Sequence, residues 1–284
     1  MALSANDQLG AAMPVLVILL QVAFLACLGS PALAHDPGTE PSQAGPIKNR
    51  QHAVELIEAY LELPAPHPEA LSALLADETV RDFGVHATLA MLSRPLLEMR
   101  LRPRASRPEP LNPADSIKLF NILEALVKDA PARRQDSSGT RLINELQSSD
   151  GIMSQGLAQM VEIGCAGEDP VLARFYYRRL NDYPRRASFD FDRANAALAL
   201  VKLYCRQGRT DEAEWIYVDF KSLNRRSGIT LRQGQAALTL IEALAAQGEP
   251  VRARHYYEEL DRLTGEKYLK DYKAKARQAL NELK

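Results

Sequence analysis

The feature that most constrains the fold is a repeat of forty residues in the second half of the chain. Three similar segments follow one another at this spacing: Ala173–Leu180 (ARFYYRRL), Ala213–Phe220 (AEWIYVDF) and Ala253–Leu260 (ARHYYEEL). A fixed period of this length is typical of architectures in which one supersecondary unit stacks on the next. The sequence therefore predicts three copies of one unit.

Each copy has the periodicity of two amphipathic helices. In the middle copy the apolar residues recur at i, i+3, i+4 and i+7, which places them on one helical face. They are Ala197, Leu200, Val201 and Tyr204, followed in the second helix by Ala213, Tyr217 and Phe220. The unit is helix, tight turn, helix and a longer connection.

The residues between these helices indicate turns and helix starts. Gly208 and Gly248 occupy C-cap positions that need a positive φ. Gly167 stands one residue earlier in the first copy, which indicates a longer connection there. Thr230–Gln233 has the form of a capping box and predicts the start of the third copy's first helix. The second helices are expected to start at Asp169–Pro170, Thr210 and Glu249–Pro250.

This order of residues resembles the tetratricopeptide repeat, in which small residues let paired helices pack closely. The middle copy matches through Leu200-Val201, Tyr204, Gly208, Ala213, Tyr217 and Phe220, and the third through Leu240-Ile241, Leu244, Gly248, Ala253, Tyr257 and Leu260. The resemblance covers residues 153–264. It implies an all-α fold, an α-solenoid of helix-turn-helix repeats, with the helix after residue 266 capping its open end.

In this family the first helix of each pair lines a concave face that binds an extended peptide or a partner helix. Carried onto this chain, the resemblance implies a partner-binding groove formed by seven residues: Gln155, Glu162, Asn195, Lys202, Arg206, Gln235 and Glu242. Amide side chains both donate and accept hydrogen bonds, which suits recognition of a peptide backbone. The expected function is a scaffold for protein binding without catalysis.

The rest of the mature chain is also expected to be helical. Apolar stripes in residues 48–150 predict helices around Val54–Leu61, Leu89–Leu97 and Ile117–Val127, with a shorter one at Arg141–Gln147. This region is either a separate helical domain or a set of degenerate repeats. Residues 151–265 hold the three repeats, and residues 266–284 the capping helix. The proline-rich Arg102–Pro110 segment is expected to be a hinge or surface connection.

Residues 1–34 are expected to send the chain across a membrane. An apolar run, Ala11–Leu28, precedes a small-x-small site at Ala32–Ala34, as in a secretory signal peptide. Its length also suits a retained membrane anchor, and Cys27 lies in a segment similar to a bacterial lipobox. All three alternatives place residues 48–284 outside the cytoplasm, in the periplasm or secreted. Residues 35–47 are expected to be a flexible lead.

The chain has 35 Lys and Arg residues and 36 Asp and Glu residues, so it lacks the overall positive charge that is typical of nucleic-acid-binding proteins. An alternative function rests on arginine pairs that recur forty residues apart, Arg185-Arg186 and Arg225-Arg226. Clustered guanidinium groups bind phosphate, sulfated glycan or anionic lipid. In this alternative the protein is an envelope-associated assembly or anchoring protein.

Residues of catalytic or metal-binding type form no recognisable motif. The five histidines have no ligand spacing, so no metal, no cofactor and no catalytic residue is expected. Cys165 and Cys205 occupy equivalent places in adjacent copies, but helix spacing disfavours a disulfide between them. An enzyme would need acids of the first half, Glu55, Glu58 or Glu62, which also fit a solvated helix face.

Overall fold

The structure is a computed structural model that describes residues 44–63, 68–101, 112–129, 148–183, 186, 189–223, 227–264 and 267–282. Over these residues it contains eleven helices and no strand, which confirms the expected all-α class. None of these helices combines the length and apolar character needed to cross a bilayer. Residues 44–284 form one compact unit.

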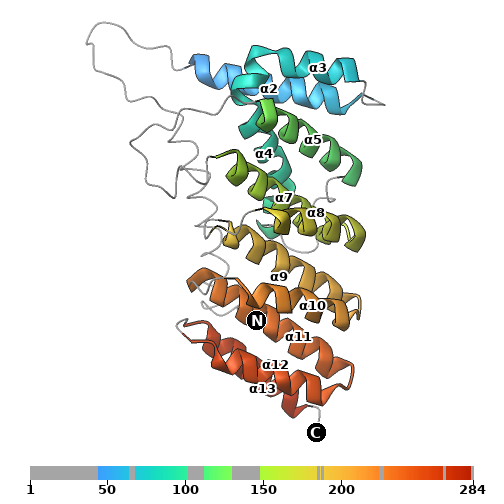
Figure 1. Ribbon diagram of the computed structural model, residues 1–284, viewed down its shortest axis with the longest axis vertical. Coiled ribbons are helices and arrows are strands. Elements are labelled where there is room, and N and C mark those ends of the chain that lie inside the picture. Colours follow the sequence, from blue (N-terminus) through green and yellow to red (C-terminus); the bar gives the residue numbers. More distant parts are fainter. Residues whose placement is uncertain are drawn as a thin grey trace, which may run out of the picture. The chain divides into compact units, whose positions relative to one another are not determined.

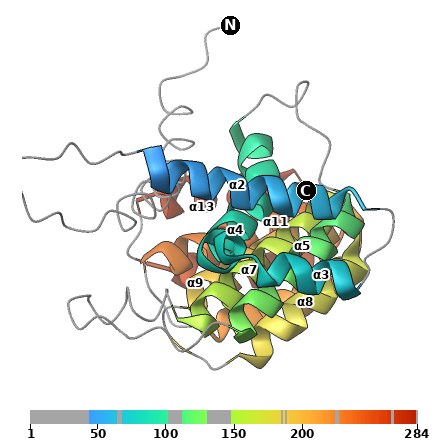
Figure 2. The same ribbon diagram turned by 90° about the horizontal axis from the view of Figure 1, so that it is seen from above.

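Four helices form the first part of this unit: α2 (Ala44–Leu61), α3 (Pro68–Ala76), α4 (Glu78–Leu101) and α5 (Pro113–Asp129). Three of them coincide with the helices that the apolar stripes predict, whereas the short α3 was not expected. Asp77 starts α4 as a side-chain cap, because its Oδ1 accepts the backbone N–H groups of Thr79 and Val80 at 2.8 and 3.2 Å. In Figure 2 α2 lies across α4, against which it packs.

Some predicted features of this region fall elsewhere or cannot be compared. Helix α2 begins at Ala44, so residues 44–47 are helical rather than part of a flexible lead. Proline in a first turn is tolerated, since its missing N–H would have no helical partner there, and Pro46 lies in that turn. The expected signal segment 1–34, the Arg102–Pro110 connection and the Arg141–Gln147 helix lie outside the described residues.

Seven helices follow in the second part, and their bounds keep the forty-residue register. They are α7 (Ser149–Ala166), α8 (Pro170–Asp182), α9 (Asp190–Arg206), α10 (Thr210–Lys221), α11 (Ser227–Ala246), α12 (Pro250–Arg262) and α13 (Leu269–Asn281). Each first helix packs against its own second helix, as α7 does on α8. The first helices also pack on one another in the order α7, α9, α11, α13 (Figure 1).

Small residues allow the paired helices to approach closely. Ala173, Ala213 and Ala253 are completely buried at equivalent places in α8, α10 and α12. At the place in α7 where α9 has Tyr204, the chain has Gly164, and a Cβ there would lie only 2.8 Å from the backbone nitrogen of Ala173. The first pair therefore packs backbone against backbone at a point where the second pair places a buried aromatic ring.

The turn between paired helices has one form in all three copies. Gly208 and Gly248 have φ values of 71° and 74°, as expected, and Glu168 takes the same left-handed conformation with φ 56°. The next backbone N–H then reaches the carbonyl five residues back, as in Asp169 to Gly164 at 2.9 Å. The expected longer connection in the first copy is thus wrong, because Glu168 occupies the glycine position without any insertion.

Helix starts agree with the sequence in part. Asp169 caps α8 through its Oδ1, and Pro170 takes the first helical position. Neither Arg209 nor Glu249 caps its helix with a side chain. The expected capping box at Thr230–Gln233 is wrong, since α11 already begins at Ser227 and the Gln233 amide instead donates to the carbonyl of Phe220 at 3.1 Å.

A buried arginine occupies the place in α9 that Gln233 has in α11. Arg193 is 2% exposed and donates to the carbonyls of Tyr183 and Leu180 at 2.6 and 3.3 Å. It also pairs with the equally buried Asp190 at 3.4 Å. Arg193 in α9 and Gln233 in α11 therefore both donate to carbonyl groups near the end of the preceding second helix, which would otherwise lack partners.

Candidate functional site

The expected binding surface lies on one face of α7, α9 and α11. Positions spaced three and four residues apart along each helix are half-buried or exposed, while the positions between them are mostly buried. We call this surface the first-helix face. Its five rows across the three helices are Ile152, Asp192, Arg232; Gln155, Asn195, Gln235; Gln159, Ala199, Thr239; Glu162, Lys202, Glu242; and Ala166, Arg206, Ala246.

All seven residues predicted for the groove belong to this face. Five of them are half-buried, and Arg206 and Glu242 are exposed. Because α7 packs on α9 and α9 on α11, the three helices present these side chains on neighbouring surfaces. The structure thus brings the predicted residues into equivalent rows.

Two of the predicted residues already use polar atoms within the chain. The Asn195 Oδ1 accepts the Arg232 Nε at 2.5 Å, and Arg232 also lies 4.0 Å from the Phe191 ring centroid. The Arg206 Nη2 donates to the carbonyl of Cys165 at 3.3 Å. These contacts cross from one first helix to the next, so part of the predicted groove also connects the repeats.

Gln155 and Gln235 differ from these residues. Their side-chain amides lie one helix either side of Asn195, are half-buried, and make no hydrogen bond to any residue in the described part of the chain. Each amide retains one acceptor and two donor hydrogens for a ligand. Groups of this kind can both donate to and accept from a peptide backbone.

Asp192 and Arg232 are functional candidates that the sequence reasoning missed. Asp192 accepts the hydroxyl of the completely buried Ser154 at 2.7 Å. Burial of its carboxyl, together with nearby Glu162, raises the pKa of Asp192 to about 7, against the Ser154 hydrogen bond and Arg193, which lower it. The forty-residue register through Ile152 would have placed both residues on the first-helix face.

Glu242 also has a perturbed carboxyl group. Burial raises its pKa, and the charge of Lys275 on α13 lowers it. Since α13 packs against α11, the last helix contributes a cation near the edge of the first-helix face. This proximity was not evident from the repeat pattern, because α13 falls outside it.

The arginine pairs are only partly described. Arg185, Arg225 and Arg226 lie outside the described residues. Arg186 is exposed, lies 3.6 Å from the Asp150 carboxylate and stacks 5.7 Å from the Phe189 ring centroid. An acidic side chain therefore already neutralises the one arginine of these pairs that can be placed.

The two cysteines of the repeats are thiols without a disulfide. Cys165 is buried and Cys205 is half-buried. Burial raises the pKa of both thiols, that of Cys205 to about 12. Both side chains therefore favour the protonated thiol near neutral pH, as buried cysteines do.

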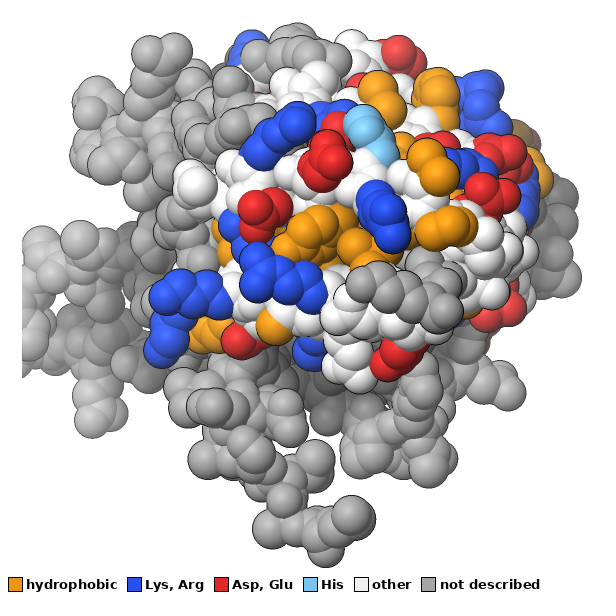
Figure 3. Space-filling model, turned by 90° about the horizontal axis from the view of Figure 1, so that it is seen from below, with side chains coloured by type: hydrophobic (Ala, Val, Ile, Leu, Met, Phe, Trp, Pro, Cys, Tyr) orange, Lys and Arg blue, Asp and Glu red, His pale blue; other side chains and the backbone are white. Residues whose placement is uncertain are grey.

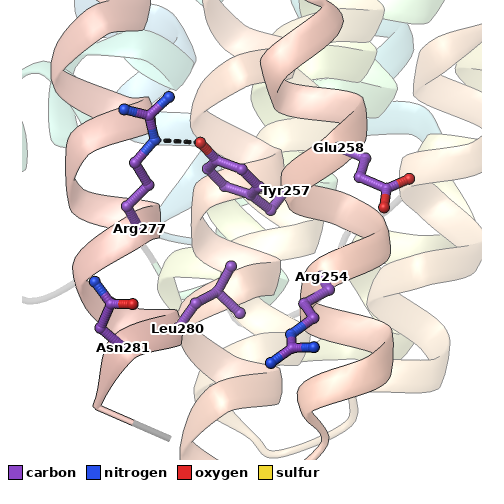
Figure 4. Close-up of a pocket in the computed structure, with 6 residues that line it drawn as sticks. All are labelled: Arg254, Tyr257, Glu258, Arg277, Leu280 and Asn281. Atoms are coloured by element: carbon purple, nitrogen blue, oxygen red, sulfur yellow. Dashed lines mark hydrogen bonds between the residues drawn. The ribbon is translucent and has the colours of Figure 1, made fainter. Parts of the chain in front are cut away.

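A hollow of about 490 Å³ lies between α12 and α13. Figure 3, which views the unit from this end, shows hydrophobic side chains interleaved with positive and negative ones. In Figure 4 the Tyr257 ring and Leu280 lie between the two helices, the Arg277 Nε donates to the Tyr257 hydroxyl, and Glu258 points away. The hollow has charges of both signs but no acid and base arranged for proton transfer.

The acids considered for an enzyme lie on the surface of the first part of the unit. Glu55, Glu58 and Glu62 are exposed on or just after α2, and Glu55 lies 3.8 Å from His52. Among the residues that the structure describes, no three His, Cys, Asp or Glu side chains form a group that would hold a metal ion.

Comparison with known proteins finds no match: no family model, no curated protein and no solved structure is similar to this chain.

Proposed function

We propose that residues 153–264 form an α-solenoid of three tetratricopeptide-like repeats whose first-helix face binds an extended segment of a protein partner, without catalysis. The amides of Gln155 and Gln235, which have no hydrogen-bond partner among the described residues, carry this proposal. They take equivalent positions on α7 and α11 and keep their hydrogen-bonding groups for a ligand. A peptide backbone offers the alternating donors and acceptors that such amides satisfy.

Equivalent contacts between successive turns support the repeat assignment. The Gln207 Nε2 donates to the carbonyl of Glu168 at 3.3 Å, and the Gln247 Nε2 donates to the carbonyl of Gly208 at 2.9 Å. Each bond links the turn of one helix pair to the turn of the pair before it. In a solenoid each unit contacts only its neighbours, so identical contacts recur along the array.

The composition of α13 supports its role as the terminal cap. Leu269 and Ala276 are buried toward the preceding helices, while Lys270 and Lys275 are exposed, as is Lys267 just before the helix. Lys273 donates to the carbonyls of Asp261 and Leu263 at 2.6 and 3.0 Å and so holds the end of α12. A polar outer face on the last helix is what an array needs at its open end.

The proposed location is outside the cytoplasm, and it rests on the apolar run of residues 11–28 alone. The partner is then a protein of the envelope or of the surrounding medium. A protein that holds such a partner without converting it needs only a stable scaffold and an exposed recognition face.

Partner capture with matched variants tests the proposal. The full chain is immobilised, exposed to the native envelope extract, and compared with a Gln155→Arg, Gln235→Arg variant. Because neither amide has a partner within the described chain, the variant should keep the fold. Asn121→Arg makes the same change of residue type on an exposed position of α5.

We expect one protein to be retained by the native chain and by Asn121→Arg, and to be lost from the double variant. Circular dichroism and the melting temperature of each variant check that the fold is unchanged. Equal retention by all three proteins, with intact folds, would refute binding at the first-helix face.

A further inference from the structure

Helix α8 contacts the next second helix, α10, through three positions on one of its faces. Arg174, Tyr177 and Asn181 lie three and four residues apart, which places them on one side of α8. The Arg174 guanidinium lies 5.3 Å from the Trp215 ring centroid. The Tyr177 hydroxyl and the Asn181 amide donate to Asp219 at 2.7 and 2.9 Å. We call these three positions of a second helix its forward edge.

Helix α10 uses the same positions, 214, 217 and 221, to contact α12. The Tyr217 ring packs edge-on against Tyr256, with 5.4 Å between the ring centroids. The Lys221 ammonium lies 2.6 Å from the Glu259 carboxylate. Glu259 has the position in α12 that Asp219 has in α10. In both cases, therefore, an acidic side chain of the covering helix meets the third position of the forward edge.

The forward edge of α12 is not covered by any helix in the described part of the chain. Its residues are Arg254, Tyr257 and Asp261. Tyr177 and Tyr217 are each 1% exposed, whereas Tyr257 is only half-buried and borders the hollow between α12 and α13 (Figure 4). Arg254 is exposed and makes no hydrogen bond or ion pair with a described residue. The edge that is covered on α8 and α10 is thus open on α12.

This open edge has the same chemistry at two positions as the edge that α10 covers. Arg254 and Tyr257 are the same residue types, in the same places, as the arginine and tyrosine of α8. Helix α10 contains four acidic residues and one lysine, a net charge of about −3. It meets the arginine of α8 with an indole and the tyrosine with a carboxylate four residues later. A helix with these two groups is therefore complementary to α12 as well.

The third position differs, because Asp261 stands where α8 has an asparagine. The Asp261 carboxylate lies 3.6 Å from the Lys273 ammonium and 4.0 Å from the Arg277 guanidinium, both on α13. These cations balance its charge, and Arg277 also donates to the Tyr257 hydroxyl. Arg254 and Arg277 both line the hollow. An incoming carboxylate would therefore find two guanidinium groups beside the tyrosine.

We propose that the forward edge of α12 and the adjoining hollow bind a helix of a partner protein, which adds one more helix to the layer of second helices. The occupant is acidic and carries an aromatic residue followed four residues later by aspartate or glutamate. Its ring stacks on Arg254, and its carboxylate meets Tyr257 and Arg277. A volume of about 490 Å³ leaves room for such side chains. This site is separate from the first-helix face and does not depend on it.

Binding of a peptide with the sequence of α10 tests this proposal. The probe is residues 209–223 of this chain, labelled with fluorescein. A hydrocarbon link joins positions 218 and 222, which are exposed on α10 and directly after it, because so short a helix is marginal in water without one. We expect saturable binding to the full chain by fluorescence anisotropy. Trp215→Ala or Asp219→Lys in the peptide should weaken this binding at least about tenfold.

One substitution with a matched control identifies the surface on the protein. Arg254→Glu removes the guanidinium that stacks on the probe and repels its acidic residues, so binding should weaken at least about tenfold. Arg178→Glu makes the same change at an exposed position of α8 that has no hydrogen bond or ion pair among the described residues. This control should bind the peptide like the native chain. Circular dichroism and the melting temperature check that both variants keep the fold.

The absence of saturable binding up to about 1 mM peptide, the range of very weak complexes, would overturn the proposal. Binding that Arg254→Glu leaves unchanged would overturn it as well, because the peptide would then lie elsewhere, for example on α8 in place of the chain's own α10. Equal binding of the Asp219→Lys peptide would refute the stated chemistry of the occupant. The Gln155→Arg, Gln235→Arg variant should bind the peptide normally, which separates failure of this site from failure of the proposed partner binding.

Discussion

At the scale of single residues, the first-helix face combines side chains that make hydrogen bonds within the chain and side chains that make none to the described residues. Among the described residues the Gln155 and Gln235 side chains have no hydrogen-bond partner, whereas Asn195 accepts the Arg232 guanidinium at 2.5 Å. A repeat position therefore does not have one role throughout the array. The sequence showed that these three residues share a row, but it could not show that an arginine thirty-seven residues later occupies the middle amide.

Asp192 makes the stability of the fold depend on pH. Its pKa in the folded chain is raised to about 7 from 3.8, mainly by burial, so the folded state holds a proton where the unfolded state has lost it. Stability conferred by the protonated form is present at low pH and is lost as the pH rises toward 7. The Asp192→Asn variant stays neutral, and its amide oxygen can still accept the Ser154 hydroxyl.

We expect the Asp192→Asn chain to gain stability relative to the native chain by about 2 kcal/mol between pH 5 and pH 7. Urea denaturation of both proteins across this range measures the difference, and the shared titrations of the other groups cancel. A difference in unfolding free energy that is flat with pH would show that Asp192 is ionised in the folded state at pH 5.

At the scale of elements, local periodicity predicted the long helices. It did not predict the short helix α3 or the residue at which α11 begins. The stripes at Val54–Leu61 and Ile117–Val127 correspond to α2 and α5. The nine-residue α3 is too short for its periodicity to stand out. The start of α11 was placed at Thr230 because the capping pattern is local, whereas the Gln233 side chain bonds to the preceding helix at Phe220.

The left-handed turn residues offer a direct test of the repeat register. A Cβ added at Gly248 would meet nothing within 4 Å, so a substitution there changes backbone conformational energy alone. We expect Gly248→Ala to destabilise the fold by about 1 kcal/mol, because an L-residue with φ 74° is strained. Glu168→Gly should change stability in the opposite direction by up to about 1 kcal/mol, since it relieves the same strain at φ 56°.

Chemical denaturation of the two variants measures both effects. A stability change of the same sign in both would contradict the assignment of Glu168 and Gly248 to one repeated turn. The Glu168 carbonyl that accepts the Gln207 amide is a backbone group, so the glycine variant retains this link between the first two turns.

At the scale of the whole molecule, the forty-residue period was the most informative part of the sequence. It predicted helix pairs with second helices starting at residues 170, 210 and 250, and the structure has α8, α10 and α12 at these places. It also predicted that the seven proposed groove residues share one face of the first helices, where five are half-buried and two are exposed. The exposure of Phe175 and Trp215 on the second helices was not predicted, because apolar residues at helical spacing are more often buried and only packing shows that these two are not.

The central claim about the whole molecule concerns the first-helix face, which we propose as the surface that holds a protein partner.

Site-specific photocrosslinking tests that claim most directly. A photoreactive amino acid replaces Gln235 on the first-helix face or Asn121 on α5, and the two full-length proteins are irradiated in their native compartment. We expect position 235 to give a discrete adduct with one other protein and position 121 to give none. No adduct at position 235, or the same adduct at both positions, would contradict the account of a partner held by the first helices.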